Sequence, residues 1–93
     1  MSPQPNARHC RLGDASRRFR GWIVALAAPS AAGPLPGDEL ERRLAEMGFV
    51  EGAEVELRHQ GLFRADPIAV LVNGVMVALR RREARAILVE AQA

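Results

Sequence analysis

The sequence is poor in several residue types that other kinds of small protein depend on. Its 93 residues include one cysteine, no lysine, no tyrosine and only four aromatic side chains. The single cysteine, Cys10, excludes an intrachain disulfide and a zinc site built from several cysteines. With so few aromatic residues, the core of one small domain must consist mainly of Val, Leu, Ile and Ala.

Long apolar runs are also missing. The longest, from Trp22 to Pro29, is much shorter than the about 20 residues that a membrane-spanning helix needs. The N-terminus contains Arg and Pro rather than the apolar stretch of a signal peptide. We therefore expect a protein that is neither inserted in the membrane nor secreted, and a reducing, cytoplasmic location.

The residues needed for common enzyme chemistry are not arranged for it. Without lysine the chain cannot form the usual phosphate-binding P-loop, and its serines are not in a Gly-x-Ser-x-Gly pattern. All 13 basic residues are arginine, which is typical of coding bias in a GC-rich genome. Five of these arginines precede residue 21, whereas residues 21–93 have eight Arg and ten acidic residues. We expect a protein that is not an enzyme and binds no cofactor.

The pattern along the chain predicts a flexible leader over residues 1–15 and one domain over 16–93. Asp38 is expected to cap a helix that Gly48 ends, with Glu41 in capping-box position. Asn73-Gly74 predicts a tight hairpin turn, and residues 60–67 are expected to form a loop. A short helical turn is expected at 80–86. The predicted strands cover residues 19–26, 53–59, 68–72, 75–79 and 87–89.

Five short strands with one inserted helix favour a mainly β fold. Closing such a sheet into a small barrel removes the edges that an open sheet leaves unpaired. The sequence therefore predicts a small β-barrel.

Several motifs, taken in order, resemble the FeoA family. They are the run from Leu44 to Leu57, including Met47-Gly48-Phe49, then Asp66-Pro67-Ile68, then Asn73-Gly74, then Ala78-Leu79-Arg80, and finally Glu83-Ala84 with Ile87. The resemblance covers roughly residues 19–90. It departs from the family pattern at turns, where Glu51 replaces the usual Pro and Ala65 replaces a frequent Gly.

The resemblance implies an SH3-like barrel that acts in ferrous iron transport without chemistry of its own. Its implied partner is the membrane transporter FeoB, which it would contact from the cytoplasmic side. The expected docking surface joins an apolar pair and its neighbour, Leu62, Phe63 and Arg64, to the polar face of the predicted helix. That face carries Arg42, Arg43 and Glu46.

Two other functions stay open from the residues alone. Arg80, Arg81, Arg82 and Arg85, with arginines of the leader, would suit a nucleic-acid surface, although a solvated helix face explains them more simply. The chain would alternatively serve as a self-associating scaffold, and a weak homo-oligomer is compatible with the first function too. We expect no metal site, because His9, Cys10 and His59 do not form a compact ligand cluster.

Overall fold

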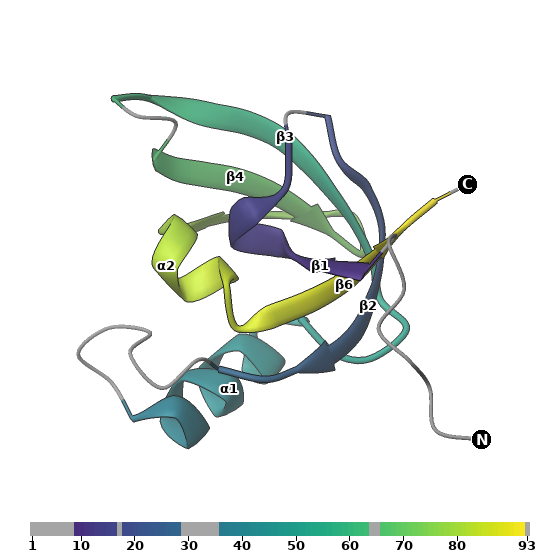
Figure 1. Cartoon of the computed structure of the whole chain (residues 1–93), viewed down its shortest axis with the longest axis vertical. Helices are drawn as coiled ribbons and strands as arrows, with labels where there is room; N and C mark the ends of the chain where they lie inside the picture. Colours follow the sequence, from purple (N-terminus) through teal and green to yellow (C-terminus); the bar gives the residue numbers. More distant parts are fainter. Residues whose placement is uncertain (1–8, 17, 29–35, 64–65, 93) are drawn as a thin grey trace.

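The computed structural model describes residues 9–16, 18–28, 36–63 and 66–92, with the backbone alone for 59–63. The elements are arranged around one sheet (Figure 1). Their bounds are β1 His9–Arg11, η1 Leu12–Asp14, β2 Arg20–Leu26, α1 Gly37–Glu46, β3 Glu54–Phe63, β4 Asp66–Val72, β5 Val75–Leu79, α2 Arg81–Ala84 and β6 Ile87–Ala91.

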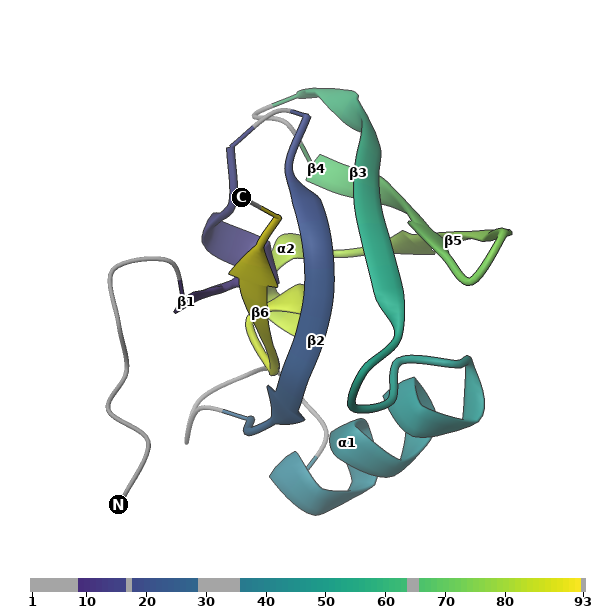
Figure 2. The same cartoon turned by 90° about the vertical axis from the view of Figure 1, so that its right-hand side faces the viewer.

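The strands form one six-stranded sheet in the order β1-β6-β2-β3-β4-β5, and all its pairs are antiparallel. The sheet curves around the core, and α1 lies beyond one end of β2 and β3 (Figure 2). The mainly β class is confirmed. Within the described residues no ladder joins β1 to β5, so the sheet is not closed by hydrogen bonds and both strands are edges.

The N-terminal part of the domain begins earlier than the sequence predicts. Residues 9–14 were expected to lie in a flexible leader, but they form β1, which pairs with β6, and the 3₁₀ turn η1. Leu12 and Gly13 are buried. Three residues are too few to show an alternating pattern, and β1 is recognisable only through its pairing partner at the other end of the chain.

The predicted loop over residues 60–67 is wrong for most of its length. β3 continues to Phe63 and β4 begins at Asp66, and these two residues pair with each other. The register between β3 and β4 shifts twice, between Leu57 and His59 and again between Gln60 and Phe63. Such irregularities interrupt the alternation of apolar and polar residues, which is why the sequence pattern ended at 59.

Helix α1 is amphipathic and packs through Leu40 and Leu44. Its expected cap is wrong: no side chain caps its first residue, and Glu41 Oε2 instead accepts a hydrogen bond from the Ala28 N–H at 2.9 Å. Glu41 therefore joins the helix to the end of β2. Gly48 follows the helix with φ of +103°, the left-handed conformation expected of the stop.

The hairpin between β4 and β5 agrees with its sequence. Asn73 and Gly74 both have positive φ, at 47° and 84°, as a two-residue turn of this type requires. The register from Ile68 opposite Leu79 to Val72 opposite Val75 has no shift. β5 is thus a regular strand that is paired on one side.

The core is largely aliphatic, as the composition requires, with Phe49 as its largest fully buried side chain. Phe49 lies three residues after the end of α1 and is 0% exposed. The buried apolar residues are Leu12, Ala15, Ile23, Leu40, Leu44, Phe49, Ala53, Val55, Leu57, Ile68, Val70, Val72, Leu79, Ala84, Ala86, Ile87 and Val89.

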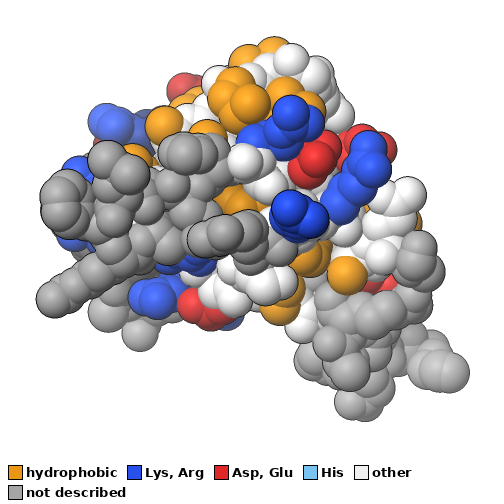
Figure 3. All heavy atoms as spheres, turned by 90° about the horizontal axis from the view of Figure 1, so that it is seen from above, with side chains coloured by type: hydrophobic (Ala, Val, Ile, Leu, Met, Phe, Trp, Pro, Cys, Tyr) orange, Lys and Arg blue, Asp and Glu red, His pale blue; other side chains and the backbone are white. Residues whose placement is uncertain are grey.

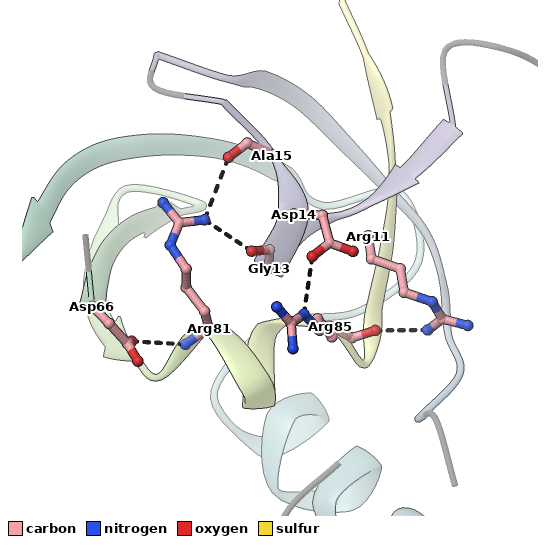
Figure 4. Close-up of polar contacts among 7 residues, drawn as sticks. All are labelled: Arg11, Gly13, Asp14, Ala15, Asp66, Arg81 and Arg85. Carbon is pink, nitrogen blue, oxygen red and sulfur yellow. Dashed lines mark hydrogen bonds and ion pairs between the residues drawn. The ribbon is translucent and has the colours of Figure 1, made fainter. Parts of the chain in front are cut away.

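One arginine fastens the N-terminal turn to the rest of the domain (Figure 4). Arg81 Nη1 donates to the backbone oxygens of Gly13 at 2.8 Å and Ala15 at 3.4 Å. The backbone N–H of Arg81 donates to Asp66 Oδ1 at 2.9 Å. We call these four residues the Arg81 clasp, because they join η1, α2 and the start of β4.

Two further arginines reinforce the same junction (Figure 4). Arg85 Nε lies 2.9 Å from Asp14 Oδ1. Arg11 Nη1 donates at 2.6 Å to the backbone oxygens of both Arg85 and Ala27. Segments about 70 residues apart in the sequence are therefore held together by arginine side chains.

Replacing Phe49 by Ala should lower the free energy of unfolding by about 3–5 kcal/mol, because it opens a cavity in the core. The neighbouring Val50, which is 45% exposed, offers a matched control: Val50→Ala should change stability by about 0.5 kcal/mol or less. Urea denaturation followed by circular dichroism measures both. Equal losses in the two variants would contradict the described core.

The clasp predicts that Arg81→Met lowers the free energy of unfolding by about 2 kcal/mol, since hydrogen bonds from a charged donor are lost. Arg82 is exposed on the same short helix, so Arg82→Met should cost about 0.5 kcal/mol or less. Native-state hydrogen exchange should also show faster exchange of the Ala15 amide in Arg81→Met. Wild-type stability in Arg81→Met would refute the clasp.

Candidate functional site

A groove of about 700 Å³ lies between the C-terminal half of α1, the end of β5 and α2. Its apolar lining comes from Leu40, Leu44, Met47, Ala78 and Leu79. Its charged lining comes from Arg43, Glu46 and Glu83. Apolar side chains combined with charges of both signs are typical of surfaces that contact another polypeptide.

Large apolar side chains remain exposed on the elements that form this groove. Met47, at the end of α1, is 41% exposed. Val75 and Met76, at the start of β5, are 60% and 53% exposed. Three such residues on adjoining elements indicate a contact surface more strongly than scattered single ones would.

The predicted docking surface involves two elements that lie far apart, the end of β3 and α1. Figures 1 and 2 place the Phe63 end of β3 at the opposite end of the molecule from α1. The ten residues of β3 extend over about 30 Å, so its two ends cannot border one compact site. The Phe63 end of the β3 backbone and α1 are thus far apart, and the docking of a partner through residues 62–64 together with the helix stays a prediction.

The individual residues of that prediction have different outcomes. Arg42, Arg43 and Glu46 are exposed on α1, as expected, and Arg43 and Glu46 line the groove whereas Arg42 does not. The side chains of Leu62 and Phe63, and the whole of Arg64, lie outside the described part of the structure. Their role in docking stays a prediction.

The β5 and α2 side of the groove was not predicted from the sequence. Ala78, Leu79 and Glu83 belong to the motifs that carry the resemblance to the FeoA family, and no role in binding was expected of them. Their approach to α1 depends on how the hairpin and the helix pack, and no local pattern reports that packing. The only sequence feature that pointed to this side of the groove was the strongly apolar run of β5 next to its turn.

The arginines of 80–85 surround a second hollow of about 480 Å³ together with Asp66. Two of these four arginines, Arg81 and Arg85, form hydrogen bonds with η1 and therefore have a structural role. On the face seen in Figure 3, basic side chains lie next to acidic ones rather than in a field of one sign. This arrangement is less suited to a nucleic-acid backbone than the sequence alone allowed.

The remaining polar candidates do not converge on one point. His9 Nε2 lies 3.8 Å from Glu90 Oε2, and that oxygen accepts a hydrogen bond from Trp22 Nε1 at 3.3 Å. In the described residues no three His, Cys, Asp or Glu side chains are close enough together to hold a metal ion. The side chain of His59 lies outside the described part.

Cys10 is a partly buried thiol in β1. Burial, with a smaller contribution from the negative charge of Asp14, raises the pKa of the Cys10 thiol above its ordinary value. Its reactive thiolate form is therefore scarcer near neutral pH than in an exposed cysteine. This environment is that of a packing residue rather than of a nucleophile.

No helix in the described residues is both long enough and apolar enough to span a bilayer.

Comparison with known proteins identifies the domain type. The family model described as FeoA domain matches residues 10–91. The solution structure of the FeoA protein from Chlorobium tepidum is 30% identical, with a TM-score of 0.70, and the match covers 89% of this chain and 70% of that one. No curated protein matches the chain.

Two further structures extend the comparison. FeoA from Stenotrophomonas maltophilia, solved with zinc and described as a prokaryotic SH3 domain protein, is 29% identical with a TM-score of 0.69 over 85% of this chain and 87% of that one. IdeR from T. acidophilum shares the fold alone, at 20% identity and a TM-score of 0.69, and the match covers 37% of its length. The SH3-like fold expected from the sequence is thus confirmed, and the chain belongs to the FeoA family.

Proposed function

We propose that the chain is a non-enzymatic accessory protein of ferrous iron transport that binds the transporter FeoB through protein–protein contacts. The family supports the process: the relative from Stenotrophomonas maltophilia is described in connection with activation of bacterial ferrous iron transport. To this process we add the proposal that the chain contacts FeoB from the cytoplasmic side.

The single observation that carries the proposal is the groove beside α1. It combines buried aliphatic side chains with the exposed Met47 and with two residues of opposite charge, Arg43 and Glu46. Interfaces that form and dissociate typically have such an apolar centre within a polar margin. The groove, rather than residues 62–64, is therefore the first candidate for the transporter contact.

The mode of action that we propose is binding alone. A protein that only binds can change its partner's activity if it binds one state of that partner more tightly than another. We propose that the domain acts in this way on the nucleotide-binding part of the transporter. Recovery of the transporter should then depend on the guanine nucleotide present.

The purified domain should recover FeoB from membranes of the same genome, and the substitution Met47→Lys should reduce that recovery at least about tenfold, as expected for a central apolar contact. Val50→Lys is the matched control, because Val50 is similarly exposed but does not line the groove. The assay compares membranes with and without guanine nucleotide.

Failure to recover FeoB would overturn the proposed partner. Equal losses with Met47→Lys and Val50→Lys would overturn the groove as its docking surface. A random oligonucleotide serves as the control for the alternative function, since salt-sensitive binding to it without FeoB would favour a nucleic-acid role.

A further inference from the structure

Strand β5 is an edge of the sheet that the described residues form. It pairs with β4 on one side, and β5 is last in the strand order of the described residues. Its sequence from Val75 to Leu79 contains no charge, proline or bulge, the features by which proteins usually keep an edge strand from pairing with another chain. Val75 and Met76 are also the two most exposed large apolar residues described.

The hairpin geometry fixes which backbone groups are available on this edge. A two-residue turn is closed by a hydrogen-bonded pair, here Val72 with Val75, and such pairs alternate along an antiparallel ladder. Val75, Val77 and Leu79 therefore direct their backbone N–H and C=O groups to β4. Those of Met76 and Ala78 face away from the sheet.

We infer that two copies of this chain associate through their β5 strands, antiparallel about a two-fold axis at Val77. In this register Met76 of each copy pairs with Ala78 of the other, so the outward groups form four backbone hydrogen bonds. The larger side chain of Met76 also lies opposite the smaller side chain of Ala78. The pairing makes one continuous sheet from two, as in strand addition at a sheet edge.

Side-chain contacts support the same register. Val75 of one copy lies opposite Leu79 of the other, next to the groove that Leu40 and Leu44 line. This contact covers the residue that is 60% exposed in the single chain. Arg80 lies opposite Gly74, so no two like charges face each other across the new ladder.

The strand itself is the segment that fits this edge, because it is uncharged and extended and two of its five residues, Val75 and Val77, are β-branched. This association involves copies of the chain alone and does not depend on the transporter. If the groove also binds the transporter, however, the dimer covers part of that surface and the two associations compete. Because the contact is small, we expect a dissociation constant between about 10 µM and 1 mM.

Sedimentation equilibrium over about 10 µM to 1 mM should show a reversible monomer–dimer equilibrium. Hydrogen exchange should slow with rising concentration at the amides of Met76 and Ala78 and stay unchanged at Val75 and Val77, which already bond to β4. Met76→Lys should abolish the dimer by placing like charges near each other at the contact. Val50→Lys is the matched control and should retain it.

A second variant tests the backbone directly. Ala78→Pro removes an outward N–H while leaving the ladder with β4 intact, and proline is tolerated on edge strands. It should give a folded monomer, which circular dichroism checks. A monomer at all concentrations in the wild type, or a dimer that persists in both Met76→Lys and Ala78→Pro, would overturn the inference.

Discussion

The architecture depends on how an open sheet is held around its core, and the Arg81 clasp is the contact that holds it. No ladder joins β1 to β5 in the described residues, so hydrogen bonds between strands do not close the molecule. Arg81 instead bonds to the backbone of η1 while its own N–H is bound by Asp66 at the start of β4. One arginine thus links the turn after β1 to α2 and, through Asp66, to the start of β4.

This constraint decides which surfaces remain available for binding. The clasp holds η1 against α2, and α1 packs on the core through Leu40 and Leu44. In the described part of the chain β5 is an edge strand, its end lines the groove, and its Met76 is exposed. The candidate site therefore lies beside the edge at which the described sheet ends.

The sequence predicted the elements whose signals are local. Asn73-Gly74 specified its hairpin and Gly48 its helix stop, because each needs a positive φ that few residues adopt. Features that depend on distant partners were missed. β1 is defined only by β6, and Glu41 bonds to Ala28 instead of capping its own helix. The same reason explains why only part of the candidate site was predicted. Arg43 and Glu46 were identified from the helix pattern, whereas the β5 side of the groove depends on tertiary packing.

The most direct test of the account is to map the transporter contact on the domain by NMR. Isotope-labelled domain would be titrated with the cytoplasmic part of FeoB, at a concentration low enough to keep the domain monomeric. The account predicts that the largest chemical-shift changes fall on the groove, at Arg43, Met47 and Ala78. Changes centred on the Phe63 end of β3, or on α2 at Arg82 and Arg85, would contradict it.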